Sequence, residues 1–189
     1  MENPNMGATE NSLMKMQVME MGGDVDVDLR FTIRWNEGEW DKNDLDAHCT
    51  EPGNHEIYFN NKISPRTGGW LDVDIIDPEE GKPSIENIQF KDRKKMIKGE
   101  YLFRVHQYTY RGGDTGFEAE IEFDNEIHKF KYPYKVEEDE YVNVAKVILH
   151  DDGHFELIRL LENSDMYIQN EAQEIEQAYK ERGLSLFKK

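Results

Sequence analysis

Cysteine, positive charge and long apolar runs are all scarce in this sequence, and each shortage excludes a class of protein. Cys49 is the single cysteine, so no intramolecular disulfide can form, which favours a reducing compartment. No run approaches the roughly 20 apolar residues of a membrane span. The N-terminus lacks the basic start and apolar stretch of a signal peptide. We therefore expect a cytoplasmic protein that does not contact a membrane.

The shortage of positive charge is the most unusual bulk property. Lysine and arginine number 23 against 40 acidic residues, so the 189-residue chain has a formal net charge of -17. Such a surface repels nucleic-acid phosphates and anionic membranes. We expect no direct nucleic-acid binding. Solubility is the favoured role of the charge, and attraction of a metal cation or a basic protein partner is the alternative. The sequence does not indicate an oligomeric state.

The N-terminal residues 1–22 are polar and Met-rich with little periodicity, which is typical of a flexible tail. Within them, Leu13–Met21 is a candidate for an added edge strand. From Asp24 to Arg34 apolar and polar residues alternate, and this period of two predicts a half-buried strand. The positions assigned to the solvent face of that strand are Asp24, Asp26 and Asp28.

Period-two runs continue to about residue 160 and predict an all-β fold. The further candidates are Leu45–Thr50, Glu56–Asn60, Leu71–Ile76, Ile85–Phe90, Gly99–Tyr110, Gly116–Phe123, Ile127–Tyr134, Tyr141–His150 and His154–Leu160. Turn residues separate them, and the pairs Asp124-Asn125 and Asp152-Gly153 are typical of tight hairpins. Short strands at this spacing predict an antiparallel β-sandwich or jelly roll over residues 23–162.

The apolar spacing becomes helical near the C-terminus. It predicts one α-helix within residues 163–189, carried by Met166, Ile168, Ala172, Ile175 and Tyr179. Gly183 is suited to end this helix. Docking on the sandwich and docking on a partner both stay open.

Carboxylates between residues 41 and 74 form the densest polar signal. The strand period places Asp44, Asp46 and His48 on one face and the alternate residues, Leu45, Ala47 and Cys49, toward the core. By the same count Asp72 and Asp74 share a face. Like charges on neighbouring strands are destabilising, and Ca²⁺, which takes six to eight oxygen ligands, would relieve the repulsion. The metal ligands predicted in this way are Asp41, Asp44, Asp46, Asp72, Asp74 and Glu86, and a solvated acidic face is the alternative.

Catalytic signatures are missing from the sequence. It contains no zinc-finger spacing, phosphate-binding glycine loop or nucleophile elbow, so we do not expect an enzyme. His48 is a candidate ligand beside the carboxylates, with an ordinary surface or core histidine as the alternative. Cys49 is expected to act as a small apolar residue. The tryptophans suit either a sugar-stacking platform or strand packing, and they are Trp35, Trp40 and Trp70.

One set of segments resembles the YfaP-like bacterial domains, a largely uncharacterised β-sandwich family. The likeness covers about residues 25–158, and its most recognisable pieces are Asp44-Leu45-Asp46-Ala47-His48, Glu51-Pro52-Gly53, Gly69-Trp70-Leu71-Asp72-Val73-Asp74 and Glu86-Asn87-Ile88. Ala47 and Cys49 depart from the family's usual residues. The resemblance implies the sandwich architecture and leaves the ligand open.

A second resemblance, over fewer segments, is to TerD-like tellurium-resistance domains. It rests on Asp44-Leu45-Asp46-Ala47, Asn60-Asn61 and Ser64-Pro65. Domains of that type bind calcium through such aspartates. The resemblance therefore implies that Asp44 and Asp46 are metal ligands.

Three functions follow from these observations. The leading hypothesis is a non-catalytic interaction module, stabilised by calcium and engaging a protein partner. The first alternative is an acidic nucleic-acid mimic that inhibits a basic protein, which requires salt-sensitive binding and indifference to calcium. The second alternative is a carbohydrate-binding module, which requires an exposed row of aromatic side chains.

Overall fold

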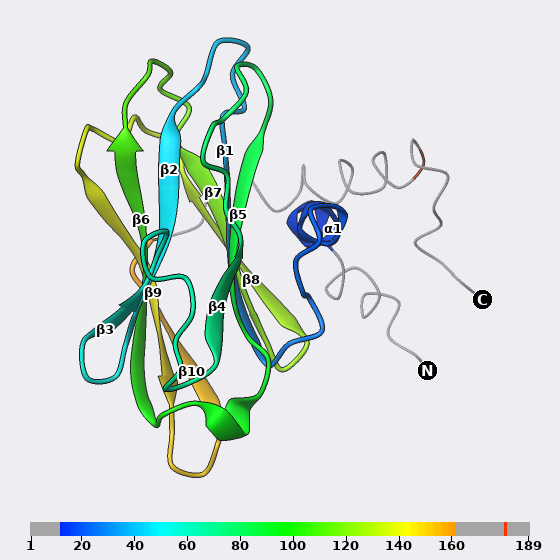
Figure 1. The fold of residues 1–189 in the computed structure, drawn as a ribbon, viewed down its shortest axis with the longest axis vertical. Coiled ribbons are helices and arrows are strands. Elements are labelled where there is room, and N and C mark those ends of the chain that lie inside the picture. Colours follow the sequence, from blue (N-terminus) through cyan, green and yellow to red (C-terminus); the bar gives the residue numbers. More distant parts are fainter. Residues whose placement is uncertain (1–11, 162–179, 181–189) are drawn as a thin grey trace.

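The computed structural model describes residues 12–161 and residue 180 (Figure 1). Two five-stranded antiparallel sheets form the body of this part of the chain. Sheet A has the order β4 (Gly69–Val73), β5 (Ser84–Phe90), β1 (Leu29–Trp35), β7 (Phe117–Phe123), β8 (Glu126–Tyr132). Sheet B has the order β10 (Phe155–Arg159), β9 (Tyr141–Leu149), β6 (Gly99–Thr109), β2 (Asp44–Glu51), β3 (His55–Ile57).

The prediction of an all-β sandwich is confirmed, and each strand predicted from Asp24 onward overlaps an observed one. The two predicted hairpins are also confirmed. Asp124 and Asn125 have φ of 51° and 62° between β7 and β8, the left-handed pair that a two-residue hairpin turn requires. Gly153 lies in the turn between β9 and β10, where the His150 N–H donates to the His154 carbonyl at 3.0 Å.

The core lies between the two sheets and follows the period-two pattern. Leu29, Phe31, Ile33 and Trp35 of β1 have 0% exposure, as does Ala47 of β2. Residues of the other long strands complete the same cluster, among them Ile88, Phe90, Tyr101, Phe103, Val105, Ala119, Ile121, Phe130, Val144 and Val147. Burial of this apolar surface is the main favourable contribution to folding.

A helix, α1 (Leu13–Glu20), packs on the outer face of sheet A (Figure 1). For these residues the prediction of a tail or an edge strand is wrong, and the first part of the predicted tail, residues 1–11, lies outside the described residues. Ser12 begins the helix by accepting a hydrogen bond from the Lys15 N–H. Met14 and Val18, one helical turn apart, pack with Val73 and Ile85 of sheet A. Only glycine allows the chain to pass this close to the contact at residue 23, because a Cβ there would lie 2.6 Å from Val18 Cγ1. Burial of one apolar stripe therefore favours a helix.

Beside the helix, part of the outer face of sheet A is polar and buried. Arg30, with 0% exposure, donates to Glu122 at 2.8 Å and to Glu120 at 3.0 Å. Ser12 at the start of α1 donates to Glu120 at 2.6 Å, and the Lys15 ammonium lies 2.5 Å from Glu122. The helix is thus anchored by charge as well as by apolar contact.

The first strand begins later than its pattern predicts, at Leu29 rather than near Asp24. The Asp24 side chain accepts from the Asp26 N–H at 3.0 Å, which favours a turn over a strand. Asp28 accepts from the Arg93 N–H at 2.6 Å, next to the short 3₁₀ helix Arg93–Lys95. These aspartates therefore shape a connection and do not form a strand face.

The predicted C-terminal helix lies outside the described residues, apart from Lys180. Within the described part of the chain, no helix has both the length and the apolar character needed to cross a bilayer.

Candidate functional site

Strand β2 lies where the two sheets meet, and this position creates the candidate site. It pairs with β6 along its length but with β3 only from Cys49 to Glu51. Before Cys49, a side chain of sheet A takes the place of the missing strand: Glu86 of β5 accepts a hydrogen bond from the Ala47 N–H at 2.7 Å. The carboxylate of Glu86 is thereby drawn to the exposed backbone edge of β2.

The two faces of β2 have the predicted composition, and the polar face is buried. Leu45, Ala47 and Cys49 belong to the core, as predicted. Asp44, Asp46 and His48 share the other face, but their exposures are only 5%, 5% and 2%. A solvated acidic face therefore does not describe these residues, and their polar groups need partners within the protein or a bound ligand.

Three carboxylates meet beside β2. Asp46, Asp74 just after β4 and Glu86 of β5 each place one carboxylate oxygen within 4.8 Å of the others. The side chains of Asp46 and Asp74 are 7% and 8% exposed, and Glu86 is 0% exposed. The cluster thus joins sheet A to sheet B by residues of both.

A β-bulge in β4 decides which aspartate reaches this cluster. Leu71 pairs with Ile88, whereas Val73 pairs with Asn87, so Asp72 is an extra residue in the strand. Leu71 consequently packs in the central core and Val73 under α1, although simple alternation would place them on one face. The prediction that Asp72 and Asp74 share a face is therefore wrong.

The six predicted metal ligands all lie in the described ranges, and the structure separates them into three groups. Asp46, Asp74 and Glu86 form the cluster. Asp44 lies beside it and is paired with Arg111 at 3.2 Å. Two others are structural: Asp72 accepts from the Asp24 N–H and from Asn87, while Asp41 accepts from the Gly38 N–H and the Thr115 hydroxyl.

The charge of the cluster is only partly offset by nearby cations. The Lys62 ammonium lies 2.5 Å from Asp74, at the exposed side. Asp46 Oδ2 and Glu86 Oε1 are buried and have no N–H or O–H donor among the described residues. Burial raises the pKa of Asp46 to about 7, with further increases from Asp44 and Asp74. Burial also raises the pKa of Glu86 well above its ordinary value, and Asp46 adds to that shift.

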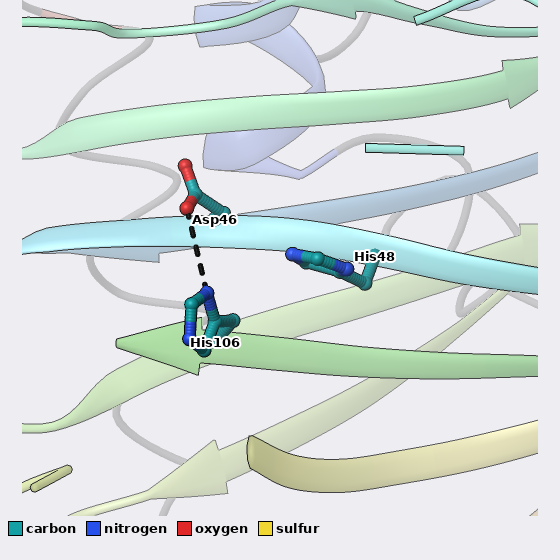
Figure 2. Close-up of side chains that lie close together, drawn as sticks. All are labelled: Asp46, His48 and His106. Atoms are coloured by element: carbon teal, nitrogen blue, oxygen red, sulfur yellow. Dashed lines mark ion pairs between the residues drawn. The ribbon is translucent and has the colours of Figure 1, made fainter. Parts of the chain in front are cut away.

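A second group shares Asp46 and includes His48, which the sequence marked as a candidate ligand, and His106, which it did not. His48 of β2 and His106 of β6 each place a ring nitrogen within 4.8 Å of an Asp46 oxygen and of each other (Figure 2). Asp46 and His106 are directly paired in the register of β2 and β6. Because 60 positions of sequence separate these two residues, only the strand pairing brings them together.

The tryptophans do not form one group. Trp35 is a core residue whose indole N–H donates to the Asn43 carbonyl at 2.7 Å. Trp40 and Trp70 are 72% and 45% exposed. Trp35 is therefore removed from the predicted sugar-stacking platform.

Comparison with known proteins identifies the fold and no family. No protein-family model matches the chain, and no curated protein is similar to it in sequence. Among solved structures, a homologue of telluride resistance protein (TerD), SCO6318 from Streptomyces coelicolor A3(2), superposes with a TM-score of 0.54 at 14% identity, over 72% of this chain and 89% of that one. An unknown function protein, SAV2460, superposes with a TM-score of 0.53 at 11% identity, with the same coverage.

These matches support the TerD-like resemblance at the level of fold alone, because both identities are too low to carry function. They do not bear on the YfaP-like resemblance, which stays a prediction.

Proposed function

We propose that the protein is a non-catalytic β-sandwich module that binds one Ca²⁺ ion through Asp46, Asp74 and Glu86. The observation that carries this proposal is the meeting of three carboxylates: Asp46 of β2 and Glu86 of β5 are buried, and Asp74, just after β4, has a side chain only 8% exposed. Ionised carboxylates at this separation in a buried site repel one another strongly. A proton or a cation must offset the charge, and a divalent cation offsets more of it.

The donor set suits calcium. Ca²⁺ accepts carboxylate oxygens in flexible arrangements and completes its six to eight ligands with carbonyls and water, whereas Mg²⁺ demands near-ideal octahedral geometry. Glu86 Oε1 is available, since its other oxygen accepts from Ala47. The ion would connect β2 of sheet B to β5 and the end of β4 in sheet A, so calcium would stabilise the packing of the two sheets. The shared fold with a TerD homologue agrees with this role and does not establish it.

The competing account is a metal-free cluster held by Lys62 and a shared proton. Thermal unfolding of the full chain, in EDTA and then in millimolar calcium, separates the two accounts. Calcium at about 100 times its dissociation constant would stabilise the native state by about 2.7 kcal/mol. Asp74→Asn should lose this response. Asp72→Asn is the matched control, since Asp72 lies two positions away and accepts hydrogen bonds from the Asp24 N–H and the Asn87 side chain.

Either of two results would refute the calcium site. One is a wild-type unfolding temperature that calcium leaves unchanged. The other is an equal calcium response in wild type and Asp74→Asn.

The module would bind a protein partner through its acidic surface. The net charge of -17 favours a basic partner and disfavours nucleic acid. Such binding should weaken as salt rises from 0.05 to about 0.5 M, because screening shortens the range of the charges. An inhibitor that mimics nucleic acid would share this salt dependence, and indifference of partner binding to EDTA would favour that alternative.

A further inference from the structure

A buried pair of histidines beside Asp46 lies on the outer face of sheet B. His48 and Asp46 are two positions apart on β2, so they point to the same side, and His106 faces them from β6. Figure 2 shows the three side chains directed toward one another. Their exposures are 2%, 5% and 7% for His48, Asp46 and His106. Two imidazoles and one carboxylate thus converge at a site largely closed to solvent.

Each of the three residues directs an unused polar atom into this group. Asp46 Oδ2, His48 Nε2 and His106 Nδ1 are buried and hydrogen-bond to no residue in the described part of the chain. The separation of His106 Nδ1 and Asp46 Oδ2 is 3.7 Å, which is too long for a hydrogen bond. Buried polar atoms of native proteins normally have partners, so three adjacent exceptions call for a ligand.

The opposite ring nitrogen of His48 is held by a carboxylate. His48 Nδ1 lies 3.1 Å from Glu56 Oε1, and Arg104 donates to the same carboxylate oxygen. His106 Nε2 lies 3.8 Å from Asp139 Oδ1, beyond hydrogen-bond distance. A carboxylate on the far nitrogen is the usual support of a metal-binding histidine, because it fixes the ring and leaves a lone pair on the near nitrogen.

Aromatic rings hold the imidazoles in place. Tyr141 stacks on His106 with centroids 4.2 Å apart, and Tyr58 stacks on His48 at 5.2 Å. Both imidazoles are therefore oriented by the rings stacked on them.

We propose that Asp46, His48 and His106 bind a transition-metal ion of the Zn²⁺ type. Imidazole nitrogen and one carboxylate oxygen suit Zn²⁺ and its first-row neighbours and do not suit calcium, which takes oxygen ligands. Three protein ligands leave a coordination position for water or a small anion. This site uses the outer face of sheet B, does not depend on the calcium proposal, and shares only Asp46 with it.

Titration of the EDTA-treated full chain with Co²⁺, followed by displacement with Zn²⁺, tests this proposal. Visible absorption reports Co²⁺ in a nitrogen–oxygen site, and calorimetry reports the Zn²⁺ stoichiometry. We expect one ion per chain. His106→Gln should weaken Zn²⁺ affinity more than about 100-fold, since losing even a supporting carboxylate costs roughly 10–100-fold. Glu56→Gln, which leaves all three ligands in place, should lower the affinity by about 10–100-fold.

Two controls locate the ion. His150 and His154 stack 4.2 Å apart at the exposed turn before β10, and this pair is another place where Zn²⁺ could bind. If the ion binds at Asp46, His48 and His106 instead, His154→Gln should leave the Zn²⁺ affinity unchanged. Asp74→Asn should keep zinc binding and lose the calcium response. His106→Gln should lose zinc binding and keep the calcium response. This crossed pattern separates failure of one site from failure of the other.

Circular dichroism would show that His106→Gln still folds. The proposal is overturned by wild-type protein that binds no Zn²⁺ or Co²⁺. It is also overturned by zinc binding that survives His106→Gln intact, or by binding lost in His154→Gln.

Discussion

Glu86 of sheet A accepts a hydrogen bond from the Ala47 N–H of sheet B at 2.7 Å, so a carboxylate occupies the position of a neighbouring strand. This contact satisfies a backbone donor that β3 leaves open, since β3 pairs with β2 only from Cys49 onward. It also explains how a carboxylate with 0% exposure comes to lie beside Asp46. The same residue therefore serves the fold and the proposed calcium site.

Two substitutions at Glu86 separate these roles. Glu86→Ala leaves the Ala47 N–H without its acceptor and should lower the free energy of unfolding by about 1–3 kcal/mol in EDTA. Glu86→Gln retains an acceptor oxygen and removes a charge from the cluster, so it should be at least as stable as wild type in EDTA. Urea unfolding of the three proteins measures this difference. Equal destabilisation by both variants would contradict the account.

The buried Arg30 should be essential to the stability of sheet A. Arg30→Met leaves Glu120 and Glu122 without their guanidinium partner, and breaking a buried ion pair by removing one member costs about 3–5 kcal/mol. Lys82→Met, which removes an exposed pair with Glu79, should change stability by less than about 1 kcal/mol. Urea unfolding checks both values. A loss below about 1 kcal/mol for Arg30→Met would show that the network is not formed.

Helix α1 should be held on sheet A by a small apolar contact. Val18→Ala removes a side chain with 0% exposure and should cost about 1–3 kcal/mol, whereas Met19→Ala, at a residue 59% exposed, should be nearly neutral. Hydrogen exchange should accelerate in α1 of Val18→Ala and remain slow in β2 and β6. Unchanged exchange in α1 would contradict the observed docking.

Acid should destabilise the fold partly through His128. Burial lowers the pKa of His128, and its Nε2 bonds to no group in the described ranges. The unfolded chain therefore binds the proton more readily, so this residue's contribution is complete above about pH 6.5 and is lost as pH falls toward the lower folded-state pKa. His128→Gln should show a shallower loss of stability between about pH 6.5 and 5. Parallel pH profiles for the two proteins would refute this assignment.

The sequence predicted the strands well because period two is a local property. Alternation along β2 placed Leu45, Ala47 and Cys49 in the core correctly. The same alternation failed in β4, where the bulge at Asp72 sends Asp74 to the cluster, and no local pattern marks that bulge. Helix α1 was missed because its apolar stripe is only two turns long, although Met14 and Val18 have helical spacing.

The candidate site was predicted only in part because it is assembled across strands. Asp46, Asp74 and Glu86 were among the predicted ligands, whereas Asp41 and Asp72 have their own hydrogen-bond partners. His106 could not be predicted, since its position depends on the register between β2 and β6. Register between distant strands is determined by packing of the whole core.

Calcium titration by calorimetry of the EDTA-treated protein tests the central claim most directly. Wild type and Asp77→Asn, which removes an exposed charge outside the cluster, should each bind one Ca²⁺ per chain. Glu86→Gln should bind it much more weakly, although it keeps the bond to Ala47. Absence of calcium binding in wild type, or equal binding in Glu86→Gln, would contradict the account. Either result would favour a metal-free cluster whose charge is offset by Lys62 and a shared proton.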